Sequence, residues 1–415
     1  MKQEWLLGAV NLINKILYDY GYKCAARQQQ SYFSREGGKI GFTNMIAITL
    51  NFLARSTQTE LNSFFEHVLK KTEAVSKQAY AEARFKLTVD AFKILYDKTA
   101  EYGSDSTDLN TFKGYRMLPI DGTTLELEDT YALRGYFGID NGCAAARASV
   151  MCDVLNKGLI LDAQLDKMIC SEREFAVRHL ARLKQLPIEN PLLVFDRGYA
   201  SADLLEKLDQ TAFLFRLQKS FNAQIDHMPL GDFVQDITIK RRVFRLRVLK
   251  LKLTTGETEM LITNLPQKLI SSADLKELYR LRWGVETAYH ILKNALQIEN
   301  FSGTNSLVVQ QDFYAAIFLK NMLAFAKLDS DDVIEQTHNP DNLYDQQTNE
   351  NQLIGILKDK LAIALLETRP RVQARKVHAI IQQAVLHPLP IRPGRHFDRT
   401  PKRKKRFHSS GKSSL

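Results

Sequence analysis

Residues 191–199 read Pro-Leu-Leu-Val-Phe-Asp-Arg-Gly-Tyr, a short apolar run followed by an aspartate and a glycine. Such a run, bounded by turn signals, predicts a buried β-strand that ends immediately before Asp196. Residues 117–125, Met-Leu-Pro-Ile-Asp-Gly-Thr-Thr-Leu, repeat the arrangement around Asp121. An isolated aspartate before a glycine is commonly no more than a turn. Open α/β sheets, however, place their sites at the carboxyl ends of strands, so we expect both aspartates there.

The residues around these runs predict the rest of a sheet. Ser171-Glu172-Arg173-Glu174 is a capping box, in which the serine and the second glutamate satisfy amides at a helix start. We therefore interpret these glutamates as helix-start residues rather than catalytic ones. Further strands are expected at 146–155, 159–165, 192–195 and 212–217, with a second helix from Ser201. This order of meander, helix, strand and helix fits an RNase H-like α/β sheet.

A charged pattern lies further along the chain, where Tyr279, Arg282, Glu286 and Lys293 follow the spacing Y-x2-R-x3-E-x6-K. At about 100° per residue these four side chains fall within roughly 60° of one another on a single α-helix. One helix face then carries a carboxylate between cations, which suits chemistry on a nucleic-acid backbone. The alternative is an ordinary charged surface helix, since Arg282 and Glu286 also form an i,i+4 pair.

The spacing between the carboxylates predicts an insertion. Glu286 lies 90 residues after Asp196, whereas a compact core needs only about one helix and one strand there. Residues 243–253 form a basic, strand-like run that turns at 254–257 into a second strand at 260–263, which predicts a hairpin. Its cationic face is suited to lie along DNA, and the alternative is a solvated sheet face.

The flanking regions are predicted to be helical. Residues 57–69 and 77–87, the second capped by Ser76, fit either a helix-turn-helix-like unit or a plain helical bundle. The expected divisions are a helical N-terminal DNA-binding region at 1–105, a catalytic core at 106–328 with a β-rich insertion at about 218–268, a linker at 329–351, a helical C-terminal region at 352–390 and a basic disordered tail at 391–415.

Composition restricts the class of partner and the compartment. The formal net charge is +10 and the pI is about 9.2, which indicates a polyanionic partner or an acidic membrane surface. The four cysteines show no CxxC pair, which argues against a zinc finger and a disulfide framework and favours a reducing cytosol. We expect no signal peptide, because residues 1–13 contain Glu4 and Asn11 and lack a small-residue cleavage site. We also expect no membrane-spanning segment, because the most apolar helical run, 315–326, contains Lys320 and Asn321 and is too short.

Together, the two aspartate-bearing strand ends and the complete YREK spacing resemble the DDE transposases of bacterial insertion sequences, in the insertion-sequence-four-like group named for that signature. The resemblance covers roughly residues 40–325. It implies an RNase H-like α/β core that is interrupted by a β-rich insertion and flanked by helical N- and C-terminal regions. It also implies that the chain is a cytoplasmic, nucleoid-associated bacterial enzyme.

The same resemblance implies roles for individual residues. Asp121, Asp196 and Glu286 would be the catalytic triad and would bind two Mg²⁺ ions, for which Mn²⁺ can substitute. Tyr279, Arg282 and Lys293 would contact DNA. The reaction would be cut-and-paste transposition, in which a homodimer brings together the terminal inverted repeats and joins them to target DNA.

Two alternatives share part of this pattern. An RNase H-like nuclease or resolvase that cuts without joining would share the three carboxylates but has no need of the Tyr, Arg and Lys at these spacings. A non-catalytic DNA-binding protein derived from a transposase has no need of an intact triad, and all three carboxylates are present here.

Overall fold

The computed structural model describes residues 4–34, 39–51, 56–105, 108–253, 256–337 and 340–392. The chain divides into two compact units. We call Gly103–Thr124 with Arg147–Tyr289 the sheet unit, and Met1–Tyr102 with Leu125–Ala146 and His290–Leu415 the helical unit. Most of the expected basic tail, from residue 393 onward, and residues 254–255 of the expected hairpin turn lie outside the described residues.

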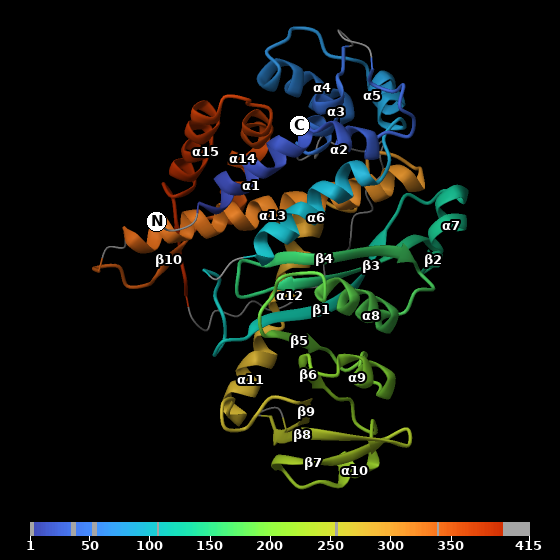
Figure 1. Ribbon diagram of the computed structural model, residues 1–415, viewed down its shortest axis with the longest axis vertical. Coiled ribbons are helices and arrows are strands. Elements are labelled where there is room, and N and C mark those ends of the chain that lie inside the picture. The colour runs from blue at the N-terminus through green and yellow to red at the C-terminus, as the bar shows by residue number, and fades with distance from the viewer. Residues whose placement is uncertain are drawn as a thin grey trace. The chain divides into compact units, whose positions relative to one another are not determined.

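The central element is a mixed sheet (Figure 1), which has nine strands among the described residues. Its order is β2-β3-β1-β5-β6-β9-β8-β7, with β4 paired to β3. The pairs β1–β5 and β5–β6 are parallel, whereas β6–β9, β9–β8 and β8–β7 are antiparallel. The strands are β1 (Arg116–Glu126), β2 (Ile139–Asp140), β3 (Cys143–Asp153), β4 (Leu159–Lys167), β5 (Pro191–Phe195), β6 (Ala212–Arg216), β7 (Gly231–Ile239), β8 (Arg242–Lys252) and β9 (Thr258–Thr263).

Helices follow the strands in the order that the sequence predicts. The capping box at Ser171 starts α8 (Glu172–Leu183), and the Ser201 hydroxyl accepts the Leu204 amide at the start of α9 (Ala202–Leu208). The buried runs of β1 and β5 pack with α11 (Ser272–Leu281), whose Leu275 and Leu278 join the same core. The expected α/β class, with helical regions toward both termini, is confirmed.

Within the insertion expected at about 218–268, the structure has a strand and a short helix in addition to the predicted hairpin. Strands β8 and β9 are that hairpin, but β7 and the short helix α10 (Ala223–His227) were not predicted. Strand β9 pairs with β6, so the insertion extends the core sheet instead of forming a separate one. The weak signal of β7 has a physical reason, because its exposed and half-buried residues do not form an apolar run.

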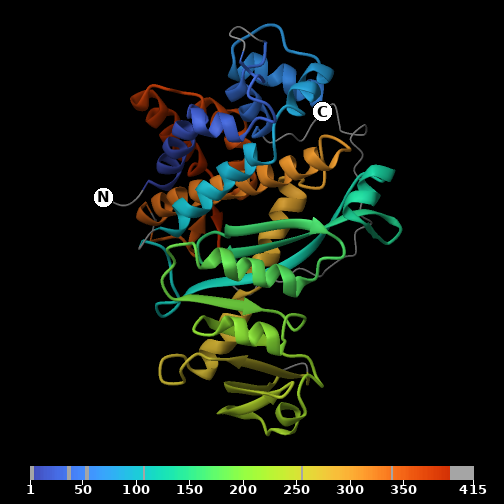
Figure 2. The same ribbon diagram turned by 45° about the vertical axis from the view of Figure 1, so that its right-hand side comes forward.

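The helical unit contains the following helical elements among its described residues: α1 (Trp5–Leu17), α2 (Tyr20–Ala25), α3 (Phe42–Thr49), α4 (Thr57–Ser63), the π-helical turn η1 (Phe64–Val68), α5 (Lys77–Arg84), most of α6 (Asp90–Ser104), α7 (Tyr131–Phe137), the π-helical turn η2 (Ile291–Ala295), α13 (Ser306–Gln336), α14 (Glu350–Leu365) and α15 (Pro370–Ala384). Two short strands, β10 (Gln346–Gln347) and β11 (Leu389–Pro390), pair with each other. Figure 2 shows α13 as the long helix beneath α1 in this unit.

Helix α13 corrects the expected linker, because it continues through Gln336 where a flexible segment from residue 329 was predicted. The polar residues there have structural partners. The Asp329 carboxylate accepts the Trp5 and Leu6 amides at 2.8 Å each, at the start of α1, and the buried Ser330 hydroxyl bonds Thr348. Polarity in this stretch therefore reflects helix capping and buried hydrogen bonds rather than a linker.

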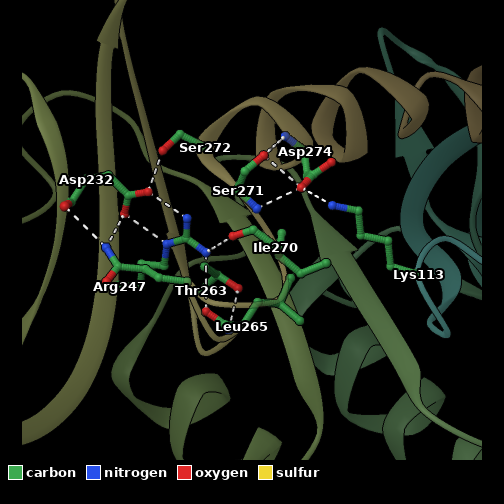
Figure 3. A network of polar contacts seen from close by, with 10 residues as sticks. Lys113, Asp232, Arg247, Thr263, Leu265, Ile270, Ser271, Ser272 and Asp274 are labelled. Atoms are coloured by element: carbon green, nitrogen blue, oxygen red, sulfur yellow. Dashed lines mark hydrogen bonds and ion pairs between the residues drawn. The ribbon is translucent and has the colours of Figure 1, made fainter.

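A buried ion pair fastens the insertion to the start of α11 (Figure 3). Arg247 on β8 is 2% exposed, and its guanidinium donates to both carboxylate oxygens of Asp232 on β7, at 2.8 and 2.6 Å. It also donates to the Ile270 carbonyl at 2.7 Å, while the Ser272 hydroxyl donates to Asp232. The Arg247 hydrogen bond is the main reason why the pKa of Asp232 is lowered to about 2. The network therefore joins β7, β8 and the first turn of α11.

Replacing Arg247 by Met should destabilise the sheet unit by about 3 kcal/mol, because it leaves the Asp232 carboxylate without its buried partner. The matched control is Arg245→Met, two residues earlier on the same strand, whose pair with Asp236 is about two-thirds exposed and should contribute less than about 0.5 kcal/mol. Urea unfolding followed by Trp283 fluorescence in a Trp5→Phe background measures this unit, since the chain has only these two tryptophans. Equal losses in the two variants would contradict the account.

Candidate active site

Asp121 lies inside strand β1 rather than at its end, which corrects the sequence expectation. The parallel pairing of β1 with β5 covers only Arg116–Pro119. Asp121 therefore lies just beyond the point where β1 leaves β5, and the strand continues to Glu126. The end of the parallel pairing, not the end of the strand, positions this carboxylate. Sequence patterns mark where an apolar run stops, and this position shows that a strand can continue past that point.

Asp196 follows β5 directly, as predicted. Its Oδ1 accepts the amide of Arg197 at 2.7 Å and the hydroxyl of Tyr279 at 3.1 Å. Tyr279 is 5% exposed and belongs to the apolar core beneath α11. The phenol predicted to contact DNA is therefore placed against a predicted catalytic carboxylate.

The YREK residues do not lie on one continuous α-helix, which corrects the sequence analysis. Helix α11 ends at Leu281, Arg282 and Trp283 form a turn, α12 runs over Gly284–His290, and η2 is a π-helical turn. The amides at 282, 283 and 285 each bond the carbonyl three residues earlier, which is the tighter 3₁₀ pattern. Spacing arithmetic at 100° per residue fails here because the turn tightens and η2 widens the helix.

Arg282 links the acidic residues of the site. Its guanidinium donates to Glu286 at 3.2 Å, lies 5.6 Å from the Tyr279 ring centre and is 5% exposed. Burial alone lowers the pKa of Arg282, but Tyr279 and the negative charges of Asp196, Asp121 and Glu286 raise it, and the net shift is upward. All three predicted catalytic carboxylates thus interact with one guanidinium.

Burial is the main reason why the pKa of Asp121 is raised to about 6. Arg282 and the Gly122 amide, which bonds Oδ1 at 3.0 Å, oppose that shift. The nearby Glu172 and Glu286 carboxylates add to it by repulsion. Asp121 therefore lies where a further positive charge would be stabilised, and its ionised form needs such a partner.

Glu172 is a site neighbour that sequence analysis missed. A Cβ on Gly122 would lie 3.4 Å from its Cγ, and a Cβ on Gly198 would lie 3.2 Å from its Oε2. The glycines near Asp121 and Asp196 thus make room for this side chain from the start of α8. The capping box was correctly predicted from the same four residues, but it involves Ser171 and Glu174, so it gave no information about where Glu172 points.

Lys293 belongs to the helical unit, whereas the other five predicted site residues belong to the sheet unit. Its ammonium lies 3.1 Å from Oε1 of Glu299, an oxygen that also accepts the Glu126 amide at 3.2 Å. The structure gives Lys293 a local acidic partner, and its contact with DNA stays a prediction.

The basic strand of the insertion does not present one cationic face. Side chains alternate along a strand, so Arg245 and Arg247 on β8 point opposite to Lys250 and Lys252. Arg245 pairs with Asp236 and Arg247 with Asp232, while the Lys250 ammonium donates to three backbone carbonyls. The structure therefore does not place these cations on one face of the hairpin, as the DNA-binding interpretation expected.

The donor set of the site suits a hard divalent cation. Carboxylate oxygens are the ligands that Mg²⁺ prefers, and the repulsion felt by Asp121 favours a cation there. Among the residues that the structure describes, no three His, Cys, Asp or Glu side chains come close enough together to hold an ion. Instead, Glu286 accepts a hydrogen bond from Arg282, and the charges of Asp121 and Asp196 act on the same guanidinium. The chemistry of the residues fits a metal, and closing the ligand set requires a shift of side chains.

The chain is similar to known proteins both in sequence and in fold. The sequence profile described as "Transposase DDE domain" matches residues 112–322, just over half of the chain, and no curated protein sequence matches. The fold is similar to the piggyBac transposase in a cryo-EM structure of its synaptic complex with hairpin DNA. That match has a TM-score of 0.51 and 12% identity and covers 89% of this chain and 85% of that chain.

The family match includes the predicted catalytic residues. The matched residues contain Asp121, Asp196 and Glu286, together with the sheet that positions them. None of the described helices has the length and apolar character needed to cross a bilayer. The chain belongs to the family of transposases with a DDE domain.

Proposed function

We propose that Asp121, Asp196 and Glu286 are the catalytic carboxylates of this transposase. The observation that carries the proposal is the buried guanidinium of Arg282, which donates to Glu286 and on which the charges of Asp121 and Asp196 also act. They come from β1, the residue after β5, and α12, which are far apart in sequence. Electrostatic convergence of such carboxylates in a partly buried place is typical of catalytic sites.

These carboxylates would hold two Mg²⁺ ions, for which Mn²⁺ can substitute. Bound metals of this kind activate a water or 3′-hydroxyl nucleophile and stabilise the departing oxygen of a phosphodiester. The chain's own contribution is orientation. Tyr279 donates to Asp196 and fixes one carboxylate, while Arg282 holds Glu286. Burial strengthens both interactions.

Arg282, Tyr279 and Lys293 would contact the DNA. A guanidinium can grip a phosphate with two hydrogen bonds, and an ammonium acts as a point charge. Arg282 is a cation that interacts with all three carboxylates. We propose that Arg282 exchanges Glu286 for a DNA phosphate, which would free the Glu286 carboxylate to hold a metal ion. The net charge of +10 supports a polyanionic substrate.

The complete YREK spacing supports membership of the insertion-sequence-four-like group and cut-and-paste transposition. The substrates would then be the terminal inverted repeats of an element and its target DNA, which a homodimer brings together in the bacterial cytoplasm, at the nucleoid. Residues 1–105 would help to recognise the element ends, and the tail at 391–415 would contact phosphates nonspecifically. The similar piggyBac structure is a synaptic complex with hairpin DNA, which supports DNA as the partner of this chain.

A transposase joins the cut DNA ends to target DNA, whereas a nuclease only cuts, so a joining assay distinguishes the two functions. Pre-cleaved element ends with free 3′-hydroxyls, incubated with the purified protein, Mg²⁺ and a supercoiled target plasmid, should give joined products on a gel. Cleavage of intact ends without any joining would remove strand transfer from the proposed function.

Asp196→Asn should abolish cleavage and reduce the rate by at least about 10³-fold, because the substitution removes a charged ligand while keeping its shape. Binding to end DNA, measured by gel shift, should change less than about threefold. The matched control is Asp203→Asn on α9, an exposed acid paired with Arg242, which should remain active. A cleaving Asp196→Asn variant would refute the assignment.

Asp121→Asn should stabilise the metal-free protein at pH 7.5 by about 1–2 kcal/mol, and by less at pH 5. The pKa of Asp121 is raised to about 6 in the fold, so ionisation costs stability as the pH rises from about 4 through 6 and the cost is complete above that window. Thermal unfolding at both pH values checks this. Mg²⁺ should stabilise the wild type but not the variant, and equal effects at the two pH values would contradict it.

A further inference from the structure

A chain of buried hydrogen bonds ends on the backbone of Asp121. The Ser149 hydroxyl on β3 donates to the Asp121 carbonyl oxygen at 3.0 Å. The same Oγ lies 2.9 Å from Nε2 of His179 on α8, and His179 Nδ1 lies 2.8 Å from Oδ2 of Asp162 on β4. Ser149, His179 and Asp162 are 0%, 0% and 4% exposed. Hydrogen bonds thus connect β4, α8 and β3, in that order, to the Asp121 carbonyl.

The direction of these hydrogen bonds follows from counting protons. A carbonyl oxygen can only accept, so the single hydroxyl proton of Ser149 points to Asp121. His179 Nε2 must then donate to Ser149. A proton also lies between His179 Nδ1 and Asp162, on one atom or the other, because two lone pairs at 2.8 Å would repel. The direction of donation is therefore fixed from His179 through Ser149 to the Asp121 carbonyl.

These residue types also occur in nucleophilic Ser-His-Asp triads, but this trio does not fit that role. Ser149 has no exposed surface, so no substrate can approach its oxygen. A nucleophilic serine gives its proton to the histidine, whereas Ser149 gives its proton to a backbone carbonyl. These three residues therefore position the Asp121 backbone, and Ser149 does not act as a nucleophile.

A second hydroxyl reaches the same carbonyl from another element. Tyr289 on α12 donates to the Asp121 oxygen at 2.8 Å. A carbonyl oxygen can only accept, so the Tyr289 hydroxyl is the donor in this contact. Tyr289 lies three residues after Glu286, one turn further along α12. Figures 1 and 2 place α8 in front of the sheet and α12 behind it. Tyr289 thus comes from the layer behind the sheet, whereas Ser149 lies in the sheet and is supported by His179 from the layer in front.

We infer that the Asp121 carbonyl is held by a clamp with two sides. Tyr289 fixes the carbonyl to α12, the helix that carries Glu286. Ser149, which is held by His179 and Asp162, fixes it to strands β3 and β4. The clamp sets the separation of the Asp121 and Glu286 carboxylates, and these four are positioning residues. The inference rests on the proposed function, since it concerns the metal ligands proposed there. Mutation of residues that hold metal ligands in place commonly lowers metal affinity or activity about 10–100-fold.

The test compares Mg²⁺ dependence in Tyr289→Phe, Ser149→Ala and the wild type. Each protein is titrated with Mg²⁺ in two assays, thermal unfolding without DNA and cleavage of end DNA. Both variants should need at least about 10-fold more Mg²⁺ for half-maximal stabilisation and half-maximal cleavage. The double variant should need more than either single variant.

A matched control separates positioning from general stability. Tyr22→Phe removes a buried phenol hydroxyl that also donates to a backbone carbonyl, that of Ala91, in the helical unit. It should lower the unfolding temperature without moving the Mg²⁺ midpoint.

The outcomes distinguish the two proposals. Midpoints within about twofold of the wild type in both Tyr289→Phe and Ser149→Ala, alongside a normal wild-type response, would overturn the clamp and leave the proposed function standing, since such supports are worth about 10-fold or more. A wild type that neither binds Mg²⁺ nor cleaves would overturn the metal site and the clamp with it.

Discussion

Repulsion between converging carboxylates is the constraint on which the site depends. Asp121 is partly buried near Glu172 and Glu286, and its pKa rises to about 6 as a result of burial and their charges. Arg282 is the counter-charge that the chain itself provides, and it interacts with all three members of the proposed triad. Without a cation, these carboxylates would be neutralised or would move apart. A residue that can grip a phosphate is thus also the residue that holds the site together.

The sheet supplies the geometry for this arrangement. Parallel pairing of β1 and β5 brings Asp121 and Asp196 to neighbouring positions, and Gly122 and Gly198 leave room for Glu172 between them. The third carboxylate comes from a different direction, after a long insertion. The buried Arg247–Asp232 pair fixes that insertion to the first turn of α11, so the position of Tyr279 depends on strands far from it in sequence.

The sequence was sufficient where a local signal had a single physical meaning. Apolar runs located β5 and β6, the hydroxyl caps located the starts of α5, α8 and α9, and the YREK spacing led to the family. Predictions were wrong where contacts between residues distant in sequence, rather than the local pattern, determine the structure. Asp121 lies within a strand because β1 pairs with β3 after leaving β5. The turn at Arg282 breaks an apparently regular helix, and polar residues after Leu328 continue α13 because Asp329 caps α1.

Other features left no local signal. Glu172 lies beside a capping box that fully accounts for its neighbours, and Ser149, His179 and Asp162 are separated in sequence and belong to no motif. The sequence of β8 suggested a row of cations, but strand alternation divides them between two faces, and Arg245 and Arg247 pair with acidic residues. Long-range pairs of this kind follow from the fold and could not be inferred before it.

The central claim is that Asp121, Asp196 and Glu286 together bind divalent metal. It is tested most directly by anomalous diffraction from crystals of the protein with cleaved end DNA, soaked in Mn²⁺. The account predicts manganese peaks within bonding distance of oxygens from all three carboxylates, with Arg282 turned toward a DNA phosphate. Manganese bound without one of the three, or Arg282 still paired with Glu286 beside an occupied metal site, would contradict it.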